Sequence, residues 1–251
     1  MVTPIDPPSG PPLGFPKCPQ CTYLRNGPPQ TCLACATSTF EGIAPNACPV
    51  CNQMLDGDTC PNWLCSDPNR RIAKIQAIAY SSGPLRRKII SYKYDGRSSW
   101  SLIFGRLLIA WLDRNARQDA PQLIIANPTF LGEGGASFGH TERVLDVAAK
   151  EDVLGEWPFD IAQPRALVKV EATSKSAANS AAAKRIAASE LHSALRLPNP
   201  ERVEGRRILV YDDVCTTGSQ LNTVAGFLID EGGAAHVEGI VLARAPWRPR
   251  S

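Results

Sequence analysis

The chain has 251 residues, a formal net charge of +3 and 9 cysteines, of which 8 lie within residues 1–71. No apolar run approaches the roughly 20 residues of a membrane-spanning helix, and the N-terminal segment MVTPIDPPSGPP lacks the basic and apolar regions of a signal peptide. We therefore expect a cytoplasmic protein with reduced thiols and no membrane partner. The small net charge is not typical of nucleic-acid-binding proteins, which need an excess of Lys and Arg.

Composition divides the chain into unequal segments. Residues 1–15 are Pro-rich and are predicted to form a disordered tail. Residues 16–37 and 46–67 form two short cysteine-rich modules, whereas residues 72–247 have the composition of an ordinary globular domain. The modules have too little apolar sequence for cores of their own, so we expect each to be stabilised by a metal ion.

The cysteine spacings predict two structural zinc sites. Two closely spaced cysteine pairs, joined by a loop of about ten residues, can place four thiolates around Zn²⁺. Successive pairing within each module is the simplest interpretation, and interleaved pairing between the modules stays open. Four ligands close each site, which indicates a structural rather than a catalytic metal. The predicted ligands are Cys18, Cys21, Cys32 and Cys35 in the first module, and Cys48, Cys51, Cys60 and Cys65 in the second.

The first module, CPQCTYLRNGPPQTCLACA, resembles the Ran-binding-protein type of zinc finger in the spacing of its cysteines. That resemblance implies binding to single-stranded RNA or to ubiquitin, although Pro16 stands where the family usually has Trp. Residues 1–71 carry 4 basic and 5 acidic side chains, and a negative balance disfavours phosphate backbones. Nucleic acid is therefore not the favoured partner, and we expect the module to dock a protein partner or to stabilise the chain.

From residue 72 onward, apolar runs alternate with helical patterns, which predicts an α/β fold with a largely parallel sheet. The predicted strands are 75–80, 123–126, 167–170, 208–211 and 237–242. The predicted helices are 84–94, a segment from 98 or 99 to 111, 140–150, 176–195 and 220–231.

The sharpest motif is RILVYDDVCTTGSQ at residues 207–220. A buried strand is followed by two adjacent carboxylates, Asp212 and Asp213, and a Thr-Thr-Gly loop then opens a helix. Ligands of open α/β sheets bind at the carboxyl ends of strands, and the N–H groups at a helix N-terminus attract phosphate. Carboxylates accept hydrogen bonds from sugar hydroxyls. The motif therefore predicts a site for a ribose 5-phosphate.

The same segment resembles the 5-phosphoribosyl 1-pyrophosphate (PRPP) motif of type I phosphoribosyltransferases. The resemblance implies that the acidic pair holds the ribose 2′- and 3′-hydroxyls and that the following loop holds the 5-phosphate. Cys215 and Gln220 depart from the family's usual aliphatic and small residues, and neither change removes a liganding group. The implied PRPP-binding residues are Asp212, Asp213, Val214, Cys215, Thr216, Thr217, Gly218 and Ser219.

A wider similarity, over roughly residues 48–246, links the chain to the ComF family, which joins a cysteine-rich zinc module to this transferase fold. It rests on the second cysteine module and on the segments YSSG at 80–83, KYDGR at 93–97, FGHTER at 138–143 and LAR at 242–244. The implied architecture is a parallel-sheet type I phosphoribosyltransferase fold preceded by small zinc modules.

Two departures from the ComF pattern lie near the implied pyrophosphate loop, which consists of Asn127, Pro128 and Thr129. The family usually has an Arg-Gly-Phe run where this chain has Ala136-Ser137-Phe138, and Asn127 replaces an aliphatic residue. Loss of an arginine weakens charge stabilisation of a leaving pyrophosphate. Lys169, Lys175 and Arg143 are candidates to supply that charge.

Two classes of function follow from the resemblance. The first is an enzyme that transfers the ribosyl 5-phosphate of PRPP to a nucleobase or amine and releases pyrophosphate, with Mg²⁺ bound to PRPP. Asp212 or Asp213 could serve as a base, although binding of ribose is the simpler role. The second is a non-catalytic ComF-like protein, either a PRPP-binding regulator or a factor in DNA uptake, that docks partners through its zinc modules.

The other titratable residues have simpler interpretations. Cys215 stands at a helix N-terminus, where thiols can be reactive, but no paired base accompanies it, so we favour a small residue that lines the loop. His140 and His192 are predicted to be surface or packing residues. The basic run Arg86, Arg87, Lys88, Lys93 and Arg97 is predicted to form one solvated helix face.

Overall fold

The computed structural model describes residues 40–95, 97–98, 100–133, 136, 138–173 and 181–246. The predicted tail and the first cysteine module, with Cys18, Cys21, Cys32 and Cys35, lie outside the described residues, as does Lys175.

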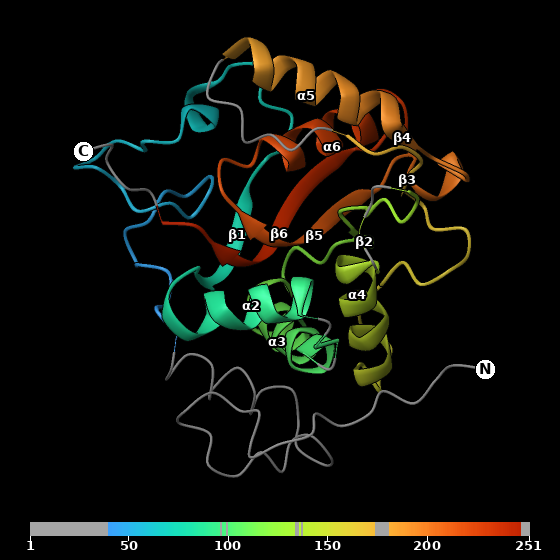
Figure 1. Cartoon of the computed structure of the whole chain (residues 1–251), viewed down its shortest axis with the longest axis horizontal. Coiled ribbons are helices and arrows are strands. Elements are labelled where there is room, and N and C mark those ends of the chain that lie inside the picture. The colour runs from blue at the N-terminus through green and yellow to red at the C-terminus, as the bar shows by residue number, and fades with distance from the viewer. Residues whose placement is uncertain are drawn as a thin grey trace.

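A parallel sheet of four strands forms the centre of the described structure, with the strand order β1-β6-β5-β2 (Figure 1). The strands are apolar along most of their length because helices cover both faces of the sheet. Their carboxyl ends meet at one edge. The strands are β1 (Ile75–Tyr80), β2 (Leu123–Ala126), β5 (Arg207–Cys215) and β6 (His236–Arg244).

Helices cover the two faces of the sheet in two groups (Figure 1). One group comprises α2 (Gly83–Tyr94), α3 (Trp100–Asn115) and α4 (His140–Glu151), and the other comprises α5 (Ala181–Ala194) and α6 (Ser219–Asp230). Side chains alternate between these faces along β5: Leu209 and Tyr211 pack under the first group, and Ile208 and Val210 under the second. Two hydrophobic cores therefore sandwich the sheet.

The second core also contains residues that precede the sheet. Leu64, in the short 3-10 helix η2 (Trp63–Ser66), is buried there with Ile72 and Ile75. The second cysteine module thus shares a core with α6, which contributes Leu221 and Val224 at helical spacing.

The mixed α/β class and the parallel sheet agree with the sequence prediction, and several boundaries differ. Strand β5 continues beyond Tyr211 to Cys215 because β6 runs beside it as far as Arg244. Helix α3 also extends further than predicted, to Asn115. Within the described residues, none of the helices combines the length and apolar character needed to cross a membrane.

The region predicted as strand 167–170 and helix 176–195 differs from the prediction where the structure describes it, and residues 176–180 lie outside the described residues. Only Val168–Lys169 forms a strand, β3, and it pairs antiparallel with β4 (Leu195–Arg196) outside the main sheet. Helix α5 ends at Ala194, because the next two residues pair with β3. A short 3-10 helix, η3 (Pro200–Arg202), then leads towards β5.

Candidate functional site

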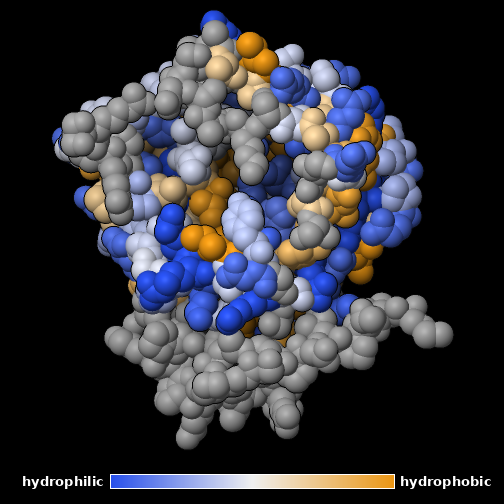
Figure 2. Space-filling model, in the orientation of Figure 1, coloured by the Kyte–Doolittle hydropathy of each residue, from blue (hydrophilic) through white to orange (hydrophobic). Residues whose placement is uncertain are grey.

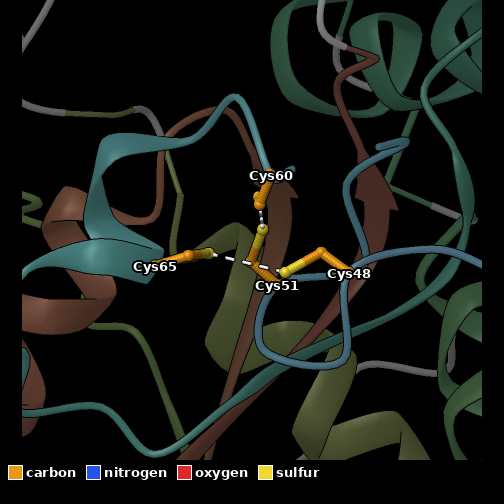
Figure 3. A group of neighbouring side chains, drawn as sticks. All are labelled: Cys48, Cys51, Cys60 and Cys65. Atoms are coloured by element: carbon orange, nitrogen blue, oxygen red, sulfur yellow. Dashed lines mark hydrogen bonds between the residues drawn. The ribbon is translucent and has the colours of Figure 1, made fainter. Parts of the chain in front are cut away.

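The four cysteines of the second module converge on one point (Figure 3). Their Sγ atoms all lie within 4.8 Å of one another, with 3.7 Å between Cys48 and Cys65 and 3.7 Å between Cys51 and Cys60. Four sulfurs at about 2.3 Å from a tetrahedral Zn²⁺ lie roughly 3.8 Å apart. The four thiols therefore fit a metal ion such as zinc, and among the described residues the four cysteines of this module form one group.

The turn that carries Cys48 and Cys51 is fixed to the sheet by the two residues after it. Asn52 adopts a φ of 54°, a left-handed conformation that Asn tolerates, and its Oδ1 accepts a hydrogen bond from the amide of Ala77 in β1 at 2.8 Å. Gln53 donates from Nε2 to the carbonyl of Ala245, just after β6, at 3.1 Å. The cysteine turn thereby lies at the carboxyl edge of the sheet.

The loop Thr216-Thr217-Gly218, here called the phosphate loop, joins β5 to α6. Gly218 caps the helix with a φ of 84°, a conformation that favours glycine. The Oγ1 of Thr217 accepts from the amide of Ser219 at 3.3 Å, and the two hydroxyls lie 2.8 Å apart. These residues line a small open pocket with Asp212, where the N–H groups of the helix N-terminus favour an anion.

The second cysteine module forms the wall behind the phosphate loop. Asn62 donates from Nδ2 to the carbonyl of Thr217 at 2.9 Å. A Cβ atom on Gly218 would lie 2.5 Å from Cδ1 of Ile75 and 3.1 Å from Cδ2 of Leu64. The module and the loop therefore touch through both a polar and an apolar contact.

Arg244 at the end of β6 also connects these two regions, and its side chain is fully buried. Its Nη1 donates to the carbonyl of Cys215 at 3.1 Å, to the Sγ of Cys215 at 2.8 Å and to the carbonyl of Thr216. Its Nη2 donates to the Sγ of Cys51 at 3.6 Å. One guanidinium thus bridges a cysteine of the metal cluster and the start of the phosphate loop.

Cys215 lies inside this contact network. Burial raises the pKa of its thiol to about 12, although the charge of Arg244 acts in the opposite direction. A protonated, buried thiol is a poor nucleophile, which supports the interpretation of Cys215 as a packing residue of the loop.

Asp212 is the first residue of β5 beyond its pairing with β2, which ends at Tyr211 and Ala126. Its Oδ2 accepts from Nδ2 of Asn127 at 2.8 Å, and its Oδ1 accepts from the amide of Asp213 at 2.8 Å. Burial, together with the charge of Asp213, raises the pKa of Asp212 to about 7. The structure therefore brings Asn127, the first residue of the predicted pyrophosphate loop, into contact with the acidic pair.

Asp213 is held by two residues that the sequence interpretation had assigned to other roles. Its Oδ2 lies 2.7 Å from Nζ of Lys93 and 3.3 Å from Nε2 of His140. Burial lowers the pKa of His140, and although burial also acts to lower the pKa of Lys93, the Asp213 carboxylate outweighs it and raises that pKa. Lys93 and His140 thus belong to the candidate site.

The prediction of one solvated basic face on α2 is therefore wrong for Lys93, whose side chain is 22% exposed. Arg86 and Arg87 on the same helix are exposed as predicted, and hydrophilic residues gather over α2 (Figure 2). The last turn of α2 instead contacts the start of α4, because Tyr92 donates from its hydroxyl to the carbonyl of His140 at 2.6 Å. Lys93 also stands in the KYDGR segment on which the resemblance to the ComF family rests, but that segment assigned it no role in a site.

The predicted pyrophosphate loop is anchored by the first turn of α4. The amide of Thr129 donates to Oε1 of Glu142 at 2.6 Å, and the hydroxyl of Thr141 donates to the carbonyl of Asn127 at 2.7 Å. A carboxylate therefore accepts the hydrogen bond of an amide that was expected to face a phosphate. Lys169, one candidate for charge compensation, instead donates to Oγ1 of Thr173 at 2.6 Å.

In comparisons with known proteins, no family model matches the chain and no curated protein is significantly similar to it.

Proposed function

We propose that the chain is a phosphoribosyltransferase-like protein that binds PRPP and transfers its ribosyl 5-phosphate to a nitrogen acceptor with release of pyrophosphate. The observation that carries the proposal is the arrangement at the end of β5. Two buried carboxylates, Asp212 and Asp213, and the phosphate loop lie side by side at the carboxyl edge of a parallel sheet. One end of this arrangement suits a phosphate and the other suits a diol.

The 5-phosphate is assigned to the phosphate loop. The first amides of an α-helix have no acceptor within the helix, and the dipole of α6 favours an anion at this end. The hydroxyls of Thr216, Thr217 and Ser219 supply further donors. Gly218 supplies the left-handed φ of 84° with which the loop turns into α6.

The ribose hydroxyls are assigned to the acidic pair. Oδ2 of Asp213 contacts Lys93 and His140. A carboxylate has more acceptor sites than these two contacts use, so a hydroxyl of the ligand can also donate to Asp213. Asp212, with a pKa of about 7, can be neutral near physiological pH and can then also donate to a sugar oxygen.

The chemistry assigned to the site needs positioning and electrostatics rather than a nucleophile. The bond between the anomeric carbon and the pyrophosphate oxygen breaks, a bond to the acceptor nitrogen forms, and the proton lost by that nitrogen passes to the released pyrophosphate or to solvent. The negative charge of Asp213 stabilises positive charge on the sugar in this step. Mg²⁺ enters with PRPP as part of the substrate and neutralises the pyrophosphate.

The chain's carboxylates leave little room for direct binding of Mg²⁺. Asp212 accepts hydrogen bonds on both oxygens, and one oxygen of Asp213 faces a lysine. The oxygen ligands that Mg²⁺ prefers would therefore come chiefly from the substrate and water. The cysteine cluster, with four ligands and no open position, is assigned to a structural zinc ion.

The test is calorimetric titration of the full chain with PRPP and Mg²⁺, followed by assay of pyrophosphate release with a set of nucleobases and amines. The double variant Asp212→Asn with Asp213→Asn should lose PRPP binding. Asp119→Asn is the matched control, because Asp119 is 76% exposed and pairs with Arg207 at the opposite edge of the sheet. Undiminished binding by the double variant, or no binding by the wild type, would contradict the proposal.

A second candidate function is a PRPP-binding regulator without turnover. The hydrogen bond from the amide of Thr129 to Glu142 favours it, because that amide is then not available to a pyrophosphate. This candidate predicts PRPP binding without release of pyrophosphate for every acceptor tried, and a protein partner that docks on the zinc modules. Pyrophosphate release with any acceptor would exclude it.

A further inference from the structure

We infer that Lys93 is a substrate-binding residue that holds the 1-pyrophosphate of PRPP, an assignment that rests on the proposed function. Lys93 lies in the last turn of α2, and its ammonium is 2.7 Å from Oδ2 of Asp213. It comes from the helix group on the opposite face of the sheet from α6. The phosphate loop and Lys93 therefore reach the acidic pair from opposite faces.

The shape of PRPP indicates on which side of the acidic pair its 1-pyrophosphate would lie. In a ribose ring, C1 and C4 stand at opposite ends of the C2–C3 edge that bears the diol, so the 1-pyrophosphate and the 5-phosphate leave the ring on different sides. If the loop holds the 5-phosphate and the acidic pair holds the diol, the 1-pyrophosphate extends away from α6. Lys93 in α2 and His140 in α4 come from the helices that pack on the face of the sheet opposite α6.

The charge of Lys93 suits the leaving group. Its ammonium is mostly shielded from solvent, with 22% of the side chain exposed, and the Asp213 carboxylate keeps it protonated. An ammonium has three N–H donors, and Asp213 needs only one of them, so the others can bind an anion. His140 beside it is kept neutral by burial, so Lys93 supplies the positive charge at this point of the site.

A purely structural role makes a different prediction. If Lys93 only neutralised buried Asp213, its loss would disturb the acidic pair and lower the affinity for every ligand that contacts the pair. If Lys93 binds the pyrophosphate, its loss should lower the affinity for pyrophosphate and PRPP much more than the affinity for ribose 5-phosphate, which lacks the 1-pyrophosphate. The comparison of these ligands therefore separates the two roles.

The experiment is calorimetric titration of the full chain with ribose 5-phosphate and, separately, with Mg²⁺-pyrophosphate. Lys93→Met should lose roughly 10- to 100-fold in pyrophosphate affinity, the range for a hydrogen bond to a charged group. Its ribose 5-phosphate affinity should stay within about 3-fold, because α2 packs on the face of the sheet opposite α6 and the phosphate loop. Lys93→Arg should recover most of the pyrophosphate affinity. Arg87→Met, an exposed residue of the same helix, is the control and should bind both ligands as the wild type does.

Equal loss for both ligands, or no loss for pyrophosphate, would overturn the assignment of Lys93 while leaving the proposed function standing. Failure of the wild type to bind ribose 5-phosphate would instead overturn the proposed function, and this assignment with it.

A measurement on the wild-type chain covers the case in which Lys93→Met does not fold. Lysine acylation, mapped by mass spectrometry, should fall several-fold at Lys93 on addition of Mg²⁺-pyrophosphate. Lys150, exposed in the last turn of α4, is the internal reference and should not change. Acylation of Lys93 that pyrophosphate leaves unchanged would also overturn the assignment.

Discussion

The side-chain amide of Asn62 donates a hydrogen bond of 2.9 Å to the carbonyl oxygen of Thr217. Asn62 lies between the last two cysteines of the metal cluster, and Thr217 is the central residue of the phosphate loop. Asn62 is also buried and caps η2 by accepting from the amide of Leu64. Asn62 therefore links the geometry of the cysteine module to the loop, in addition to the contacts of Arg244 and Leu64.

Replacement of Asn62 with Ala should loosen the phosphate loop without removing a metal ligand. Loss of a buried hydrogen bond should lower the free energy of unfolding by about 1–3 kcal/mol. Affinity for ribose 5-phosphate should fall roughly 3- to 30-fold, while the bound zinc, measured by elemental analysis, should stay unchanged. Asn69→Ala, at an exposed position after the cluster, is the control. Unchanged affinity in Asn62→Ala would show that the loop does not depend on this contact.

Loss of the metal should also lower the affinity of the candidate site for ribose 5-phosphate. Cys60→Ser should lower the bound zinc by one equivalent per chain, because the remaining three thiols leave the tetrahedral set incomplete. It should also lower the midpoint of thermal unfolding and weaken ribose 5-phosphate binding.

Cys215→Ala supplies the matched control for that metal prediction, because Cys215 is a buried cysteine outside the cluster. It should retain the full complement of zinc. Ribose 5-phosphate affinity in Cys60→Ser equal to that of the wild type would show that the cluster and the loop are independent.

The main sheet was predictable because each of its strands is a short apolar run that stands between segments with helical periodicity. The extension of β5 to Cys215 was not, since it depends on β6 running beside it to Arg244. The pairing of β3 with β4 involves two residues on each side, which is too short to leave a periodic pattern. Pairing between strands is a property of the assembled sheet rather than of either segment.

The residues of the candidate site also divide into those that a local sequence motif identifies and those that only the assembled fold brings together. The phosphate loop, the acidic pair and the four clustered cysteines stand in short local motifs, so spacing alone was enough to single them out. Asn62 and Arg244 act on segments 155 and 193 residues away, and Lys93 meets Asp213 only because α2 ends at the carboxyl edge of the sheet. Such contacts have no spacing signature in the sequence.

Gly218 provides a test of the contact between the loop and the core. Gly218→Ala places a Cβ atom 2.5 Å from Ile75 and 3.1 Å from Leu64, at a φ of 84°. Gly205→Ala, at a φ of 67° with no atom within 4 Å of its Cβ, has the backbone strain alone. That strain should cost about 1–2 kcal/mol in both variants, and Gly218→Ala should lose more because the core must shift.

Chemical denaturation of the two glycine variants measures the difference, and titration with ribose 5-phosphate measures its effect on binding. Only Gly218→Ala should lose affinity for the phosphate. Equal destabilisation of the two variants would mean that the core accommodates the methyl group and that the contact with Leu64 does not fix the loop.

The acidic pair should make stability depend on pH in a defined direction. The pKa of Asp212 rises from 3.8 to about 7 in the folded chain because of burial and the charge of Asp213, which Lys93 and Asn127 offset only in part. The folded state therefore binds the proton more tightly than the unfolded state does. The resulting stabilisation is complete below the unfolded pKa and is lost as the pH rises through the folded value.

Asp212→Asn removes this titration, so its free energy of unfolding relative to the wild type should increase between about pH 4 and pH 7. Urea denaturation across that range measures the change. Asp213→Asn provides the second arm: without the neighbouring charge, the pKa of Asp212 should fall towards its ordinary value, and the pH dependence should shift to lower pH. A constant difference between Asp212→Asn and the wild type would mean that Asp212 stays ionised in the folded chain, and its role would then be that of a hydroxyl acceptor alone.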